Sequence, residues 1–251
     1  MKKFAPDNSG KIQISSNEAS VNWLLCDAPS DVDKKYLVGL GVDLGLLNDA
    51  LDPHEVPRLE FTSDWIYLIM RAPNVSGDSG DFTTPILFAI NANMLITVSR
   101  DDLSQLWQPF IEGAILDSGQ TKQLFLMMME FMAQNYQSKV AQINRQMRAL
   151  TDNTPRTYSK EIISVVEHER RLNDYLDALI PTNTALERLL SKDDFKFREE
   201  DADEIEDLSI DFEQVIARCK SLLRTIQNDR DSYRTIMDTR LNETMRALTV
   251  I

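Results

Sequence analysis

The sequence predicts an α+β protein: an N-terminal αβα sandwich, then an antiparallel helical pair and a very long C-terminal stalk helix. Short apolar runs bounded by turn residues recur as far as Ser99. Glycine and proline, with 8 and 9 copies in 251 residues, almost disappear from the second half. From Gly119 onward, apolar residues recur at helical spacing. We therefore divide the chain into 1–118, 119–198 and 199–251.

The first of these parts alternates short strands with helices. Ser30 or Asp31 can cap a helix over 30–41 that Gly41 ends, and a second helix follows over 43–51. In "WIYLIM", which begins at Trp65, both faces are apolar, so we expect a central strand covered by helices on both sides. The strands that we expect are 11–15, 21–26, 58–61, 65–72, 85–90 and 94–99.

Three helices are expected in the second half. The first covers 119–150, and Pro155 in "TDNTPRT" separates it from a second helix over 158–190. A third begins near Glu199 and meets no helix-breaking residue before the chain ends, so it could run for about 50 residues and roughly 75 Å.

The third helix carries two patterns. A seam with alternating spacings of three and four residues indicates coiled-coil-like packing of Ile205, Leu208, Phe212, Val215, Cys219, Leu222 and Ile226. The regular pattern weakens at Asp229, and another stripe then shares one face: Asp231, Asp238, Asn242, Met245 and Thr249. This stripe is either a face in contact with water or a polar surface with a function.

The net charge of −13 argues against nucleic acid or an anionic membrane surface as the main partner, because phosphates would be repelled. Residues 199–211 carry eight acidic residues and no basic one. Such a run is often only a solvated face. Alternatively, Glu204, Asp207 and Asp211 could face another subunit and hold Mg²⁺, which prefers oxygen ligands and keeps much of its water shell.

Signals for other chemistry are lacking in the sequence. Cys26 and Cys219 have no partner pattern and resemble the reduced cysteines of a cytosolic protein, and His54 and His168 are too isolated for a zinc site. No nucleotide-binding or hydrolase motif occurs, so we do not expect an enzyme. We also expect no signal peptide and no membrane span, since Glu130 interrupts the most apolar window, 124–133.

Three segments resemble the CorA family of magnesium and cobalt transporters. "LNETMRALTVI" (241–251) is similar to the junction between the family's stalk and its membrane helices, an Asn-x-x-Met followed by Lys/Arg-x-Leu-Thr-x-Ile. Residues 51–73 and 85–100 resemble two strand regions of its N-terminal domain. The resemblance covers essentially the whole chain in the right order.

The resemblance implies the cytoplasmic part of a transporter subunit at the inner or plasma membrane. The subunit would form a homopentamer around a pore for Mg²⁺, with Co²⁺ possible as cargo. Two transmembrane helices would follow residue 251, and the family's Gly-Met-Asn selectivity motif would lie between them.

Residue roles follow by position. The resemblance implies that Asp207 is a stalk carboxylate at an inter-subunit Mg²⁺ site, with Asp211 beside it. Its partner would be a loop acid of the neighbouring subunit, with Asp78 the first choice and Asp81 the second. The pore-lining residues would be Asp231, Asp238, Asn242, Met245, Leu248 and Thr249.

The implied mechanism is a latch. Intracellular Mg²⁺ would bridge Asp207 to the neighbour's acid and hold the pore closed, and its loss would free the stalks to shift. Two alternatives remain open: a zinc transporter of the ZntB-like branch, and a soluble acidic coiled-coil scaffold.

Overall fold

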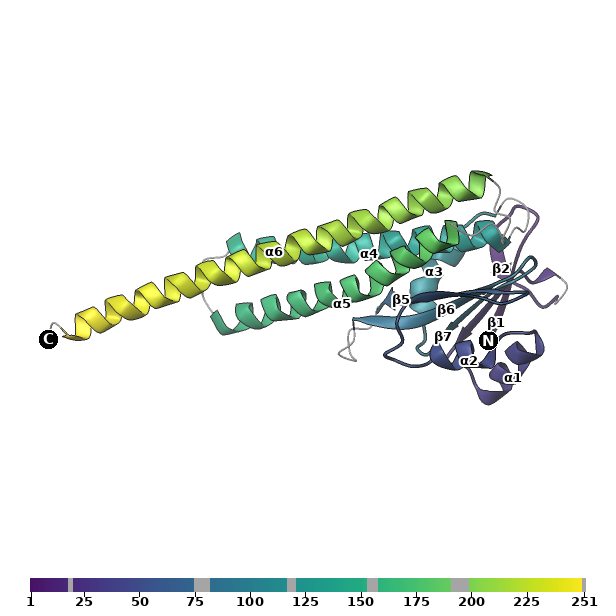
Figure 1. Cartoon of the computed structure of the whole chain (residues 1–251), viewed down its shortest axis with the longest axis horizontal. Helices are drawn as coiled ribbons and strands as arrows, with labels where there is room; N and C mark the ends of the chain where they lie inside the picture. The colour runs from purple at the N-terminus through teal and green to yellow at the C-terminus, as the bar shows by residue number, and fades with distance from the viewer. Residues whose placement is uncertain (18–19, 75–81, 117–120, 153–157, 191–198, 250–251) are drawn as a thin grey trace.

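Figure 1 shows the computed structural model of the chain, which describes residues 1–17, 20–74, 82–116, 121–152, 158–190 and 199–249. The strands are β1 (Lys2–Pro6), β2 (Ile12–Ile14), β3 (Trp23–Asp27), β4 (Arg58–Phe61), β5 (Ile66–Pro73), β6 (Thr83–Ile90) and β7 (Leu95–Ser99). The helices are α1 (Asp31–Gly39), α2 (Leu44–Asp49), α3 (Ser104–Gly113), α4 (Thr121–Asp152), α5 (Tyr158–Leu190) and α6 (Glu199–Thr249).

The strands form one sheet of seven, in the order β2-β1-β3-β7-β6-β5-β4. Only the β3–β7 pair is parallel among these strands, with Trp23 opposite Leu95. β5 and β6 are paired over their full lengths and have buried side chains on both faces, as expected of apolar runs without polar alternation.

Helices cover both faces of the sheet (Figure 1). α1 and α2 lie on one face, where Leu37 and Leu47 share a core with Leu24 and Ile69. α3, α4, α5 and α6 lie on the other face and share one larger core with the sheet, in which Trp107 packs edge-on against Trp23 and Phe88. The sheet contributes to both cores because successive side chains of a strand point to opposite faces.

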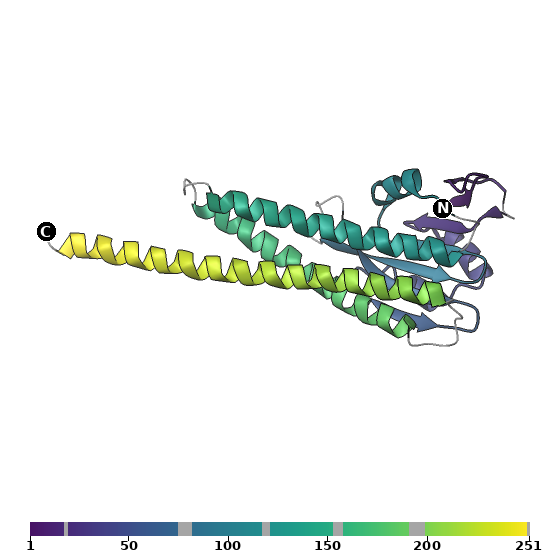
Figure 2. The ribbon, with the colours of Figure 1, turned by 90° about the horizontal axis from the view of Figure 1, so that it is seen from above.

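α6 lies along α4 and α5 and continues well past their ends (Figure 2). Its seam residues Ile205, Phe212, Cys219 and Ile226 are completely buried. The seam therefore packs within its own chain, against the two shorter helices.

The predicted fold class is confirmed, with two elements missed. Ser30 caps α1 through a reciprocal pair of hydrogen bonds with Asp33, and Gly41, with φ of +93°, follows the end of that helix as expected. The prediction did not include β1 or α3. β1 is a short strand that contains lysine and proline, and α3 holds Pro109 and has no side-chain cap at Leu103. The strand expected to be central, β5, is buried on both faces but lies next to the edge strand β4.

Candidate cation site

Four acidic residues surround a hollow between α4 and α6. The hollow has a volume of about 410 Å³ and is lined by Gln123, Leu126, Met127 and Glu130 of α4 and by Glu204, Asp207, Leu208 and Asp211 of α6. Glu204, Asp207 and Asp211 follow spacings of three and four residues, which places them along one face of α6. All three acids of α6 that the sequence offers as Mg²⁺ ligands, Glu204, Asp207 and Asp211, therefore line one hollow.

The helix packing positions these carboxylates. Leu126 of α4 and Leu208 of α6 are buried at the base of the hollow, while the four acids are exposed around it. On α4, the side-chain amide of Gln134 donates a 3.0 Å hydrogen bond to Glu130 Oε1. Gln123 also lines the hollow, and its buried Oε1 has no hydrogen-bond partner among the described residues.

The chemistry of the hollow suits a hydrated cation. No basic residue is among the described residues that line it. Throughout the described segments, no three or more His, Cys, Asp or Glu side chains are grouped so that they could hold a metal ion directly. An ion that keeps several waters, as Mg²⁺ does, needs only one or two direct carboxylate ligands. The exposed acids of the hollow can supply one or two such ligands.

The other predicted residues are placed less completely. Asp78 and Asp81 lie outside the described residues, as do the side chains of Asp238, Asn242, Leu248 and Thr249, although the last four belong to helix α6. Asp231 is exposed, and so is Met245, at 60%.

Sequence reasoning missed the α4 side of the hollow. In the sequence, Glu130 stands out only as the charge that interrupts the most apolar window, and no motif marks Gln123. A carboxylate inside an otherwise apolar helix was the signal, because an isolated charge in such a position faces either water or a ligand. Only the packing of α4 on α6 shows which acids it faces.

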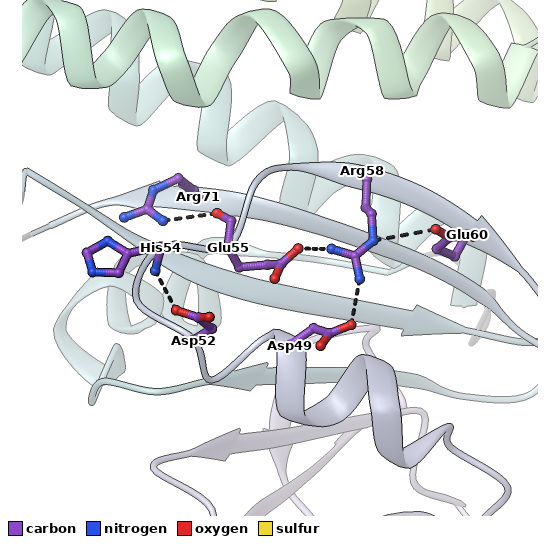
Figure 3. Close-up of polar contacts among 7 residues, drawn as sticks. All are labelled: Asp49, Asp52, His54, Glu55, Arg58, Glu60 and Arg71. Carbon is purple, nitrogen blue, oxygen red and sulfur yellow. Dashed lines mark hydrogen bonds and ion pairs between the residues drawn. The ribbon is translucent and has the colours of Figure 1, made fainter.

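The segment between α2 and β4 is held by two arginines (Figure 3). Arg58 forms ion pairs with Glu55, with Asp49 at 2.6 Å and with Glu60 at 3.4 Å. In the same segment, the backbone N–H of His54 donates to Asp52 at 2.9 Å. These contacts join residues between Asp49 and Glu60, a segment that overlaps the stretch 51–73 whose sequence resembles the transporter family.

Arg71, on β5, ties this segment to the sheet. Its guanidinium donates to the carbonyl oxygens of Pro53 at 2.8 Å and Glu55 at 3.1 Å, and to both the hydroxyl and the carbonyl of Thr83 on β6. From the opposite face, the hydroxyl of Tyr136 on α4 donates a 2.5 Å hydrogen bond to the Arg71 carbonyl. Arg71 thus connects α4, the strands β5 and β6, and the segment between α2 and β4.

We expect Tyr136→Phe to destabilise the chain by about 1 kcal/mol, because it removes one hydrogen bond inside the core and leaves the ring in place. Burial raises the pKa of Tyr136 well above its ordinary value, so its hydroxyl remains a donor at neutral pH. Urea denaturation followed by circular dichroism measures the loss. Tyr36→Phe is the control, since Tyr36 is exposed on α1. Equal losses in the two variants would contradict a special role for the Tyr136 hydrogen bond.

A family model and a curated relative both match this chain to CorA proteins. A family model described as CorA-like Mg²⁺ transporter protein matches residues 18–251. The cobalt/magnesium transport protein CorA of Methanocaldococcus jannaschii is 22% identical over 247 residues, which cover 95% of this chain and 77% of that protein. None of the described helices contains an apolar stretch long enough to cross a membrane.

Solved structures show the same fold. The complete CorA magnesium transporter from Methanocaldococcus jannaschii superposes with a TM-score of 0.83 at 20% identity, covering 99% of this chain and 81% of that one. The full-length CmaX protein has a TM-score of 0.83 at 15% identity, covering 100% and 81%. The ZntB cytoplasmic domain from Vibrio parahaemolyticus has a TM-score of 0.62 at 14% identity, covering 92% and 100%.

Proposed function

The chain belongs to the CorA-like Mg²⁺ transporter family, and on that premise we propose that it is the cation-sensing cytoplasmic part of a divalent-cation transporter subunit. Subunits assemble as a homopentamer, and membrane helices follow residue 251. The hollow between α4 and α6 is the observation that carries the sensing role, because it gathers four carboxylates with no basic residue among its described lining.

The ligands of the hollow favour Mg²⁺ over Zn²⁺. Its polar lining consists of four carboxylates and one side-chain amide, the oxygen ligands that Mg²⁺ prefers. Zinc sites are built mainly from cysteine and histidine, with Asp or Glu as an additional ligand in some of them. The chain has two of each, and both cysteines are buried away from this hollow. This lining supports our proposal of Mg²⁺ as the cargo, with Co²⁺ as a second cargo, over the ZntB-like alternative.

The subunit senses Mg²⁺ through the repulsion between carboxylates that no longer have an ion between them. A hydrated Mg²⁺ at Asp207 and Asp211 is shared with a loop acid of the adjacent subunit, for which Asp78 is the first candidate and Asp81 the second. The bound ion favours the closed arrangement of subunits, and its loss leaves like charges facing each other. Because α6 carries both acids, the relaxation moves α6 itself.

The far end of α6 forms the passage. Beyond the tips of α4 and α5, α6 is not covered by the rest of its own chain (Figure 2), and its Asp231, Arg234, Thr239 and Met245 side chains are exposed. Five such helices would enclose a path for hydrated ions, whose lining is Asp231, Asp238, Asn242, Met245, Leu248 and Thr249. Polar groups can hold the water shell of an ion that dehydrates reluctantly.

The test is magnesium flux through the full-length transporter in liposomes that hold a fluorescent Mg²⁺ indicator. Wild-type uptake should slow as millimolar Mg²⁺ accumulates on the cytoplasmic side. In the double variant Asp207→Asn, Asp211→Asn, this inhibition should weaken by tenfold or more in Mg²⁺ concentration, because charge is removed while the side-chain volume is kept. Initial uptake should persist.

Glu213→Gln is the matched control, since Glu213 is exposed on the same helix and does not line the hollow. Unchanged inhibition in the Asp207/Asp211 variant, or equal loss in Glu213→Gln, would reject the proposed site. Inhibition and flux with Zn²⁺ but not with Mg²⁺ would favour the ZntB-like alternative. Absence of any flux would favour the acidic scaffold, against which the family assignment argues.

A further inference from the structure

His168 is a buried histidine with one long polar contact among the described residues. It lies on α5, and its residue surface is only 6% exposed. Its Nε2 is 3.4 Å from the hydroxyl of Ser164, and its Nδ1 has no hydrogen-bond partner within the described part of the chain. A neutral imidazole needs one donor and one acceptor contact, whereas the protonated ring has two donors to satisfy.

The imidazole lies on the side of α5 that faces the helical core. Leu172 and Tyr175, four and seven residues further along, are buried on the same side. The ring of Tyr175 meets that of Tyr136 on α4 edge-on, with centroids 5.2 Å apart. α6 is joined to α5 one residue after His168, where Arg230 and Glu169 form a 2.8 Å ion pair.

The charges around His168 do not favour its protonated form. Burial and the positive charge of Arg171 lower the pKa of His168, and the negative charge of Glu167 opposes them. Glu167 is already paired with Arg171 at 2.9 Å, and Glu169 with Arg230. The Arg171 guanidinium is itself held 4.5 Å from the ring of Phe82.

The other titratable groups in this core are neutral near pH 7. Burial raises the pKa of Tyr175 on α5 and of Cys219 on α6 to about 12 each. Burial also raises the pKa of Tyr136 on α4. None of these three groups therefore carries a negative charge that could stabilise an imidazolium.

We propose that His168 is a pH-sensitive element whose protonation loosens α5 from α4 and α6. The imidazolium gains a second N–H that must find an acceptor, and the two adjacent carboxylates are occupied by arginines. Water can accept a hydrogen bond from the new N–H, but the ring reaches water only if α5 moves outward from the helical core. Since α6 packs on α5, acidification would release part of the support of α6.

The lowered pKa of His168 determines how the stability of the chain changes with pH. Between the folded pKa and the ordinary value of 6.5, the unfolded chain binds more protons than the folded chain. His168 therefore contributes stability above about pH 6.5, and this contribution is lost as the pH falls below that value. Burial raises the pKa of Asp27, which has the opposite effect on stability. The lowered pKa values of Asp7, Asp33 and Asp102 act below their ordinary value of 3.8.

The chain offers a clean test because it contains only two histidines. We expect the melting temperature of the 251-residue chain to fall by about 2 °C or more between pH 7.5 and pH 5.5. His54→Asn should keep this fall, since His54 is exposed. His168→Asn and His168→Leu should each abolish it, whatever their stability at pH 7.5. A flat wild-type profile, or a slope removed by His54→Asn, would overturn the proposal.

Hydrogen–deuterium exchange separates local loosening from a general loss of stability. After correction for the intrinsic pH dependence of exchange, peptides from 163–178 and 215–230 should exchange several-fold faster at pH 5.5 than at pH 7.5. Peptides from β5, β6 and β7 should not change, and His168→Asn should show no acceleration in α5 or α6. Acceleration spread evenly over the sheet and helices would refute a local release of α5.

Discussion

Replacing Phe212 by alanine should lower the stability of the chain by about 3–5 kcal/mol, the largest loss expected from any single change discussed for this protein. Phe212 is completely buried at the centre of the α6 seam. Its loss removes apolar contact with the helical core and leaves a cavity that rigid helices fill poorly. Folded domains are stable by only about 5–15 kcal/mol, so the change is a large part of the total.

Urea denaturation followed by circular dichroism at 222 nm measures this loss. Ile210→Ala is the matched control on the same helix, because Ile210 is 45% exposed and its truncation leaves no internal cavity. It should cost less than about 1 kcal/mol. Similar losses at the two positions would contradict the packing of α6 described above. The sensing role proposed above predicts that Phe212→Ala also weakens the inhibition of uptake by Mg²⁺, since it loosens the helix that carries Asp207 and Asp211.

Arg71→Met should cost about 3 kcal/mol, because it removes the four hydrogen bonds that the guanidinium makes to described residues. A hydrogen bond to a charged group contributes about 1.5–3 kcal/mol, and these four act as one set rather than independently. Methionine keeps much of the side-chain volume but leaves the carbonyl oxygens of Pro53, Glu55 and Thr83 without this donor. The free energy of unfolding in urea is the measurement.

Arg58→Met is the control for Arg71→Met. Arg58 has three acidic partners, but its side chain is 30% exposed, and those of Asp49 and Glu60 are 45% and 50% exposed. Surface ion pairs contribute about 0–1 kcal/mol and weaken in salt. We therefore expect a small loss for Arg58→Met that shrinks further in 0.5 M NaCl, and a loss for Arg71→Met that persists. A larger loss for Arg58→Met would show that charge pairing, rather than buried hydrogen bonding, holds this segment.

The helices show how far periodicity alone can predict structure. The second helix was predicted over 158–190 and α5 spans the same residues, because a long repeat averages out the local preferences of single residues. The seam of α6 was predicted from spacing, and six of its seven residues are buried, with Leu222 half-buried. In both cases the information lies within one element.

β1 and α3 show where local reasoning fails. β1 has no apolar alternation of its own, and its place between β2 and β3 depends on hydrogen bonds to residues elsewhere in the chain. α3 contains Pro109, which argues against a helix, yet Leu106, Trp107 and Phe110 are buried in the larger core. Burial of these large side chains outweighs the local penalty.

The sequence by itself determined the elements with strong periodicity and the acidic character of α6, and it offered Asp207 and Asp211 as candidate cation ligands. Spacing along one helix is enough to place side chains on a common face. Only the tertiary structure brought Glu130 and Gln123 of α4 to those acids, joined Arg71 to Tyr136, and enclosed His168 in the helical core. These contacts join residues far apart in the chain, and such contacts depend on how whole elements pack together.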